Sequence, residues 1–189
     1  AREMCIRDSL SDYMPIGYNR PINENDNSWR PDDSIFGGFW EGGKHWSEVI
    51  KDDAIEFIND SQNFQNPFFM YLAFNAPHDP RQAPKKFLNL YPIEKISIPV
   101  NYSPAHPYMY EIGNGPGLRD EALAPYPRSK YSVKKHIQEY YAIITHLDEQ
   151  VGKIISHLEN KKLLENTYII FTSDHGLSVC LLYTSDAAD

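Results

Sequence analysis

Two histidines and an aspartate stand at positions of this sequence where side chains often do chemistry. Asp174 and His175 come soon after the apolar run 168–171, and His78 follows the uncharged run 68–74. A carboxylate beside an imidazole can form half of a metal site, because both groups supply lone pairs to divalent cations. The alternative is that Asp174 caps a following helix and His175 packs in a loop, and the dipeptide alone favours neither.

His78 is bracketed by Pro77 and Pro80. Each proline restricts the backbone at its own position and at the residue before it, so we expect the imidazole on a stiff turn. A stiff mounting suits a catalytic group. An isolated histidine of this kind is more often an ordinary loop residue. A functional role for His78 is favoured by the similar arrangement at Asp174, which also follows an apolar run.

The apolar runs before these residues are predicted to be strands buried on both faces of a parallel sheet. Neither residues 68–74 nor residues 168–171 contain a charge. Parallel strands bring their carboxyl ends to one crevice, where open α/β sheets bind ligands and metals. We therefore expect His78, Asp174 and His175 along the same edge of a sheet.

Helical patterns precede both predicted strands. Ser47 is predicted to cap a helix over residues 47–60, and a brief helix is predicted at residues 84–90. A longer helix over residues 133–160 is predicted from an apolar stripe at helical spacing, formed by Ile137, Tyr140, Tyr141, Ile144, Leu147, Val151, Ile154, Ile155 and Leu158. The repeated order of helix then strand predicts an α/β fold.

Other motifs carry less chemistry. His136, His146 and His157 lie on the long predicted helix and are expected to be surface or packing residues rather than ligands. Residues 38–44 fit the start of a phosphate-binding loop, but His45 follows where Ser or Thr should hold magnesium, so aromatic and glycine packing is preferred. The proline-rich stretch 91–130 is predicted to be a long loop on the substrate side.

Composition excludes several classes of protein. The 189 residues are 41% hydrophobic, enough for one core, with no apolar run long enough to cross a membrane. The net charge of -8 argues against a nucleic-acid surface and weakly supports cation binding. Cys5 and Cys180, one near each end, fit neither a disulfide framework nor a cysteine-rich metal site.

The two ends of the chain resemble translated sequencing-adapter tails. These ends are residues 1–9 and 180–189, and we expect the native segment to be residues 10–179 of a longer protein. Localisation is then left open by the sequence, because the true amino terminus would be missing.

Four blocks, in this order, resemble the sulfatase family of the alkaline-phosphatase superfamily. They are residues 68–80 (Phe-Phe-Met-Tyr-Leu-Ala-Phe-Asn-Ala-Pro-His-Asp-Pro), 117–125 (Gly-Leu-Arg-Asp-Glu-Ala-Leu-Ala-Pro), 139–148 (Glu-Tyr-Tyr-Ala-Ile-Ile-Thr-His-Leu-Asp) and 166–176 (Asn-Thr-Tyr-Ile-Ile-Phe-Thr-Ser-Asp-His-Gly). The resemblance implies a mixed, mainly parallel sheet between helices, incomplete in this segment. It also implies hydrolysis of sulfate esters, with a sulfated small molecule or carbohydrate as substrate, in a periplasmic or secreted protein.

The resemblance gives roles to the three residues already singled out. Asp174 resembles the late metal-ligand aspartate of the family, and His175 stands at the adjacent ligand position, so both would help bind a calcium ion. His78 resembles the histidine that contacts the sulfate near the leaving oxygen. Calcium prefers oxygen ligands, which favours the assignment of Asp174 as a ligand over that of His175.

Parts of the family pattern are missing. The nucleophile, a formylglycine made from Cys or Ser in a Cys/Ser-x-Pro/Ala-x-Arg motif, has no counterpart in this sequence, and Cys5 lacks the required neighbours. The early metal aspartates are missing as well. The resemblance thus implies a sulfatase that is catalytically incomplete as given, with the formylglycine expected in an upstream segment.

Alternatives to a sulfatase remain open on the sequence. A phosphatase or phosphonate hydrolase of the same superfamily would also end a strand in Asp-His, with zinc as the metal. A noncatalytic carbohydrate-binding module could use the aromatic loops, but it would leave both strand-end sites without a purpose.

Overall fold

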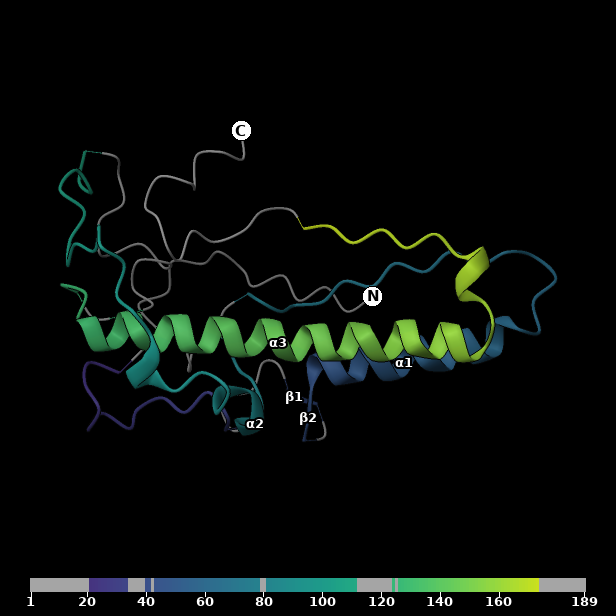
Figure 1. The fold of residues 1–189 in the computed structure, drawn as a ribbon, viewed down its shortest axis with the longest axis horizontal. Coiled ribbons are helices and arrows are strands. Elements are labelled where there is room, and N and C mark those ends of the chain that lie inside the picture. The colour runs from purple at the N-terminus through teal and green to yellow at the C-terminus, as the bar shows by residue number, and fades with distance from the viewer. Residues whose placement is uncertain are drawn as a thin grey trace.

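A computed structural model gives the arrangement of the chain (Figure 1). The structure describes residues 21–33, 40–41, 43–78, 81–111, 124 and 126–173. Its helices within these ranges are α1 (Trp46–Ser61), α2 (Lys85–Leu88) and α3 (Lys130–Asn160), and its 3₁₀ turns are η2 (Ile93–Lys95) and η4 (Leu164–Asn166). The strands β1 (Trp40–Glu41) and β2 (Lys44–His45) form a short antiparallel hairpin.

The long helix α3 confirms the prediction from the apolar stripe. It begins at Lys130, where the Ser129 side chain accepts a hydrogen bond from the Ser132 amide at 3.0 Å. The predicted apolar stripe is wrong at one position: Ile144 is 37% exposed, and the neighbouring Ile143 is buried in its place. At 3.6 residues per turn, both isoleucines stand at helical spacing from Leu147, but only one can face the core.

Helix α1 packs against the carboxyl half of α3. Ala54 and Ile58 of α1 are buried together with Ile154 and Leu158 of α3. Burying a side chain of the size of Ile or Leu contributes about 1.5–3 kcal/mol, so this cluster is a main source of stability for the helix pair. The predicted cap is wrong, since His45 occupies the N-cap position and its side chain accepts from the Ser47 amide.

A second apolar cluster lies on the middle of α3. Phe87 and Leu88 of α2 pack there with Ala76 and Ala83, the residues on either side of the turn that carries His78. The α3 side of the cluster is formed by Ala142, Ile143 and Leu147. The brief helix predicted near residue 84 is confirmed, and it fastens this turn to α3.

Residues 68–74 are extended, as predicted, but they are not buried on both faces. Phe68, Met70 and Leu72 pack on the cluster between α1 and α3, whereas Phe69 is 87% exposed and Tyr71 is 81% exposed. In the described part of the chain, no strand pairs with this segment. The expectation of two buried faces is wrong here, because burial of the outer face needs a further layer of structure.

Residues 167–173 are also extended, and all four residues of the apolar run 168–171 are exposed. The chain turns back after α3 through η4 and continues extended, in the same direction as residues 68–74 (Figure 1). Ile170 is 87% exposed and Phe171 is 77% exposed, so the prediction of a buried strand is wrong for these residues. The same direction is what a parallel pair requires, yet the only ladder among the described residues is the β1–β2 hairpin.

The described loops lie along α3. The Trp29 Nε1 group donates to Glu139 Oε1 at 2.7 Å, and both residues are buried. In the segment between α2 and α3, the Arg128 amide donates to the Pro104 carbonyl at 2.8 Å. No helix in the described ranges combines the length and apolar character needed to cross a bilayer.

Candidate functional site

The turn that carries His78 is anchored at both ends. Ala76, before His78, and Ala83, after it, belong to the same buried cluster on α3, and residues 79–80 between them lie outside the described residues. The His78 amide donates to the Asn75 carbonyl at 2.9 Å, which closes the first half of the turn. The His78 residue itself is exposed. The sequence predicted a stiff turn from the neighbouring prolines, but neither the exposure of His78 nor the burial of Ala76 and Ala83 was predicted.

Three polar contacts hold the second end of this turn. The fully buried Gln82 donates from Nε2 to the Asp33 carbonyl at 2.9 Å, and its own carbonyl lies 2.8 Å from His45 Nε2. The Ala83 amide donates to the Pro31 carbonyl at 3.2 Å. The turn is thus tied to the loop 31–33 and to the start of α1.

Arg81 adds a contact with α3. Its side chain is buried, and its Nη1 lies 2.8 Å from His136 Nδ1. Because a guanidinium group only donates hydrogen bonds, His136 Nδ1 accepts, so the His136 ring is neutral. The guanidinium carbon also stands 5.5 Å from the centre of the Tyr140 ring. His136 therefore has a packing role, in keeping with its predicted class.

The buried His45, which lies next to Gln82, contacts a second buried histidine, His146. Their ring centres are 4.4 Å apart, in an edge-on contact. His45 Nδ1 accepts from the Ser47 amide at 3.1 Å and Nε2 donates to Gln82, so the ring must be neutral to make both bonds. His146 Nε2 lies 3.1 Å from Glu48 Oε1, to which it donates.

Burial disfavours the charged form of both rings. It is the main cause that lowers the pKa of His45 to about 4, and the nearby His146 lowers it further. Burial likewise lowers the pKa of His146 to about 4. The hydrogen bonds and the pKa of His45 thus point to the same neutral state, and His146 is a packing residue, one of the two roles predicted for it.

Sequence reasoning missed the polar residues that hold the turn. Arg81 and Gln82 look like ordinary loop residues, and the sequence indicated no structural role for His45, which stands as a misfit in a phosphate-binding loop. One available signal was the pair Pro80 and Pro84, which stand on either side of Arg81 and Gln82. Two prolines so close together make this stretch too stiff for a free loop. A prediction of burial still needed knowledge of α3 and of the loop 31–33.

The two predicted metal ligands, Asp174 and His175, lie outside the described residues. Residues 167–173 lead directly to them along an extended segment. Among the residues that the structure describes, no group of three or more His, Cys, Asp or Glu side chains could hold a metal ion. Since calcium takes about six to eight oxygen ligands, the described residues alone do not fit that ion.

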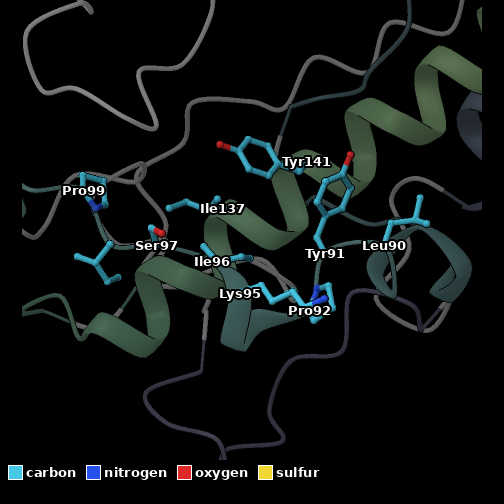
Figure 2. A pocket seen from close by; sticks show the side chains of 10 residues that line it. Leu90, Tyr91, Pro92, Lys95, Ile96, Ser97, Pro99, Ile137 and Tyr141 are labelled. Atoms are coloured by element: carbon cyan, nitrogen blue, oxygen red, sulfur yellow. The ribbon is translucent and has the colours of Figure 1, made fainter.

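A cavity of about 430 Å³ opens elsewhere, between α3 and the segment that follows α2 (Figure 2). Figure 2 shows Ile137 and Tyr141 of α3 facing Tyr91 and Ile96 across it. Lys95 is the one charged residue among those that line the cavity. Binding a sulfate group needs several hydrogen-bond donors, so this mostly apolar lining suits it poorly. His78 is not among the lining residues.

The comparisons with known proteins agree on one family. The sequence model of the family described as Sulfatase matches residues 8–186. A sulfatase of Formosa agariphila is 33% identical over 124 residues, which cover 61% of this chain and 23% of that protein. The iduronate 2-sulfatase of Mus musculus is 34% identical over 138 residues, 66% of this chain and 24% of that protein.

A third relative is the arylsulfatase of Clostridium perfringens, 28% identical over 137 residues that cover 72% of this chain and 27% of that protein. The chain therefore spans about a quarter of the length of the curated relatives it matches. The family match, by contrast, extends over nearly the whole of the chain itself. The chain belongs to the sulfatase family.

Proposed function

We propose that this chain is the part of a sulfatase that presents His78 to a sulfate ester. The observation that carries the proposal is the exposed His78 on a turn whose two ends are buried against α3. Membership of the sulfatase family supplies the reaction, hydrolysis of a sulfate ester. The substrate is a sulfated small molecule or a sulfated carbohydrate.

The chemistry assigned to His78 is stabilisation of charge. When the sulfate ester bond breaks, negative charge develops on the leaving oxygen, and an imidazole fixed beside it offsets that charge. A group of this kind works best when it needs no reorganisation during the reaction. The burial of Ala76, two residues before His78, supports this assignment.

We assign the metal to the end of the extended segment 167–173. Asp174 would ligate a calcium ion there with its carboxylate, and His175 would stand at the adjacent position. Once bound, the ion would withdraw charge from the sulfate oxygens. The described residues contain no complete cluster for calcium, so further ligands must come from other parts of the protein. The nucleophile, a formylglycine, is proposed to lie upstream of this chain.

We further propose that residues 68–74 and 167–173 are strands of a mainly parallel sheet in a longer protein, of which residues 10–179 are the native segment. Three observations support this: both segments are extended, they run in the same direction, and they expose large apolar side chains (Figure 1).

The proposal is tested by the substrate preference of the full-length protein that contains this chain. Turnover of an aryl sulfate should exceed turnover of the matching aryl phosphate, measured as released phenol under the same conditions with calcium present. A preference for the phosphate, enhanced by zinc, would favour a phosphatase of the same superfamily. Binding of a carbohydrate with no turnover of either ester would favour a noncatalytic module.

A further inference from the structure

We propose that His45 is a positioning residue for His78, because it joins the second end of the His78 turn to the start of α1. This inference rests on the proposed role of His78 and deepens it. His45 makes no contact with substrate in this account. It acts through the backbone of Gln82, four residues beyond His78.

The residues around His78 are held both by apolar contacts and by directional hydrogen bonds. The two ends of the turn sit in one apolar cluster, and apolar contacts allow small sliding movements because they have little directionality. The bond from His45 Nε2 to the Gln82 carbonyl, at 2.8 Å, is directional and lies in the interior. With the bond from Gln82 Nε2 to the Asp33 carbonyl, it fixes this end of the turn in position.

The two ring nitrogens of His45 bond to different partners. Nδ1 accepts from the Ser47 amide and so caps α1, while Nε2 donates to Gln82. The ring therefore works as a rigid bridge of fixed length between a helix start and the turn. His146 supports it from one side through the 4.4 Å ring contact, and Phe87 lies against His146 with ring centres 4.8 Å apart.

Water cannot replace the bond between His45 Nε2 and the Gln82 carbonyl. His45 is 1% exposed and Gln82 is 0% exposed, so a lost donor would leave the Gln82 carbonyl unsatisfied in the interior. The backbone would then shift to recover a partner. A shift of about 1 Å at a catalytic group can lower the rate about 100-fold.

Two substitutions of His45 separate its two bonds. In His45→Asn, the amide oxygen can take the place of Nδ1 and still accept from Ser47, but no atom reaches Gln82. In His45→Gln, the amide nitrogen can take the place of Nε2 and still donate to Gln82, while the cap on α1 is weakened. Both variants lose the ring and its contact with His146.

The test is performed on the full-length protein with an aryl sulfate. We expect His45→Asn to lower kcat by roughly 10- to 100-fold with a smaller change in KM, and His45→Gln to retain most of the parent kcat. The midpoint temperature of thermal unfolding, Tm, should fall by similar amounts in the two variants. Equal kcat in both variants, with equal loss of Tm, would show that His45 has only a structural role.

A double-mutant cycle with His78→Ala links the effect to His78. If His45 acts through His78, His45→Asn should cause little further loss of kcat once the imidazole of His78 is gone. Additive losses would overturn the inference while leaving the proposed role of His78 intact. If His78→Ala alone leaves kcat unchanged, the proposed role of His78 fails first, and the inference fails with it.

A second variant covers the case in which His45→Asn does not fold. Gln82→Met has nearly the same length but cannot donate to the Asp33 carbonyl, so it loosens the same end of the turn from the other side. We expect it to lower kcat and to be non-additive with His78→Ala. A folded Gln82→Met protein with the kcat of the parent would contradict the proposed positioning.

Discussion

At the scale of single residues, three histidines of the described part of the chain differ in burial. His78 is exposed on its turn, whereas His45 and His146 are enclosed between α1, α3 and the residues after the turn. An exposed imidazole can meet a substrate. A buried imidazole with both nitrogens directed at fixed partners holds other groups in place, and this is the work of His45.

The buried pair predicts a loss of stability in mild acid. Burial lowers the pKa of His45 and of His146 from the ordinary value of 6.5 to about 4, so the unfolded chain takes up protons first. Stability is therefore complete above pH 6.5 and is lost as the pH falls from 6.5 towards 4. Each ring contributes on the order of 3 kcal/mol to this change.

This prediction is checked by urea unfolding of the full-length protein at about pH 7 and about pH 5, a window set by the two lowered pKa values. The charged groups around the pair are Glu48 and Glu149 with Lys86 and Lys153, and all four remain in place in a His146→Gln variant. That variant should show a smaller loss between the two pH values. An equal loss in parent and variant would mean that other groups control the acid response.

Asp174 predicts a dependence on calcium. In the full-length protein, Asp174→Asn removes a charged oxygen ligand, and the calcium affinity, measured by titration calorimetry, should fall at least about tenfold. Sulfatase activity should fall with it. Asp148→Asn on the exposed side of α3 is the matched control and should change neither quantity. Equal effects of the two substitutions would place the metal site elsewhere.

Residue patterns predicted part of this site. The prolines around His78 indicated a stiff turn, and the structure places the ends of that turn in the core. Arg81, Gln82 and His45 could not be identified in the same way, because a polar side chain is buried only where partners from distant segments satisfy it. Those partners, in the loop 31–33 and on α3, are far apart from them in sequence.

At the scale of elements, helices were predictable and strands only partly so. Helices α1 and α3 make their own backbone hydrogen bonds, and an apolar stripe suffices to indicate their buried face. A strand depends on neighbours for its hydrogen bonds and for the burial of both faces. Residues 68–74 are extended as predicted, yet Phe69 and Tyr71 are exposed because no further layer covers them among the described residues.

Neighbouring isoleucines on α3 offer a test of the packing. Ile143→Ala should destabilise the full-length protein by about 2–5 kcal/mol, because it leaves a cavity against Ala83 and Phe87 of the apolar cluster. Ile144→Ala, one residue further on the partly exposed side, should cost clearly less. Urea unfolding of both variants measures the difference. A larger loss for Ile144 would mean that the face of α3 has been assigned wrongly.

At the scale of the whole molecule, the exposed apolar segments are the main features that favour association between chains. Tyr71, Ile170 and Phe171 are exposed on extended segments without partners in the described part of the chain. Such edges pair readily with other chains. The chain also spans only about a quarter of its curated relatives, which agrees with the proposal that more structure covers these segments in the whole protein.

The isolated chain of 189 residues is accordingly expected to associate and to release no sulfate. Size-exclusion chromatography with light scattering should show oligomers, and Phe69→Lys combined with Ile170→Lys should reduce them by placing charges on both exposed segments. Calorimetry should show no sharp transition. A monomer with a sharp transition that rises on addition of calcium would contradict this expectation and would require a complete metal site within the chain.

The central claim, that His78 on its anchored turn acts on the sulfate ester, is tested most directly by the kcat of His78→Ala in the full-length protein. Removing one group that stabilises developing charge lowers the rate by roughly two to three powers of ten, so turnover of an aryl sulfate should fall by that amount. His157→Ala is the matched control, because His157 lies at the far end of α3 with its Nε2 bonded to Asn59, and it should keep the parent kcat. Equal turnover in the two variants would contradict the account.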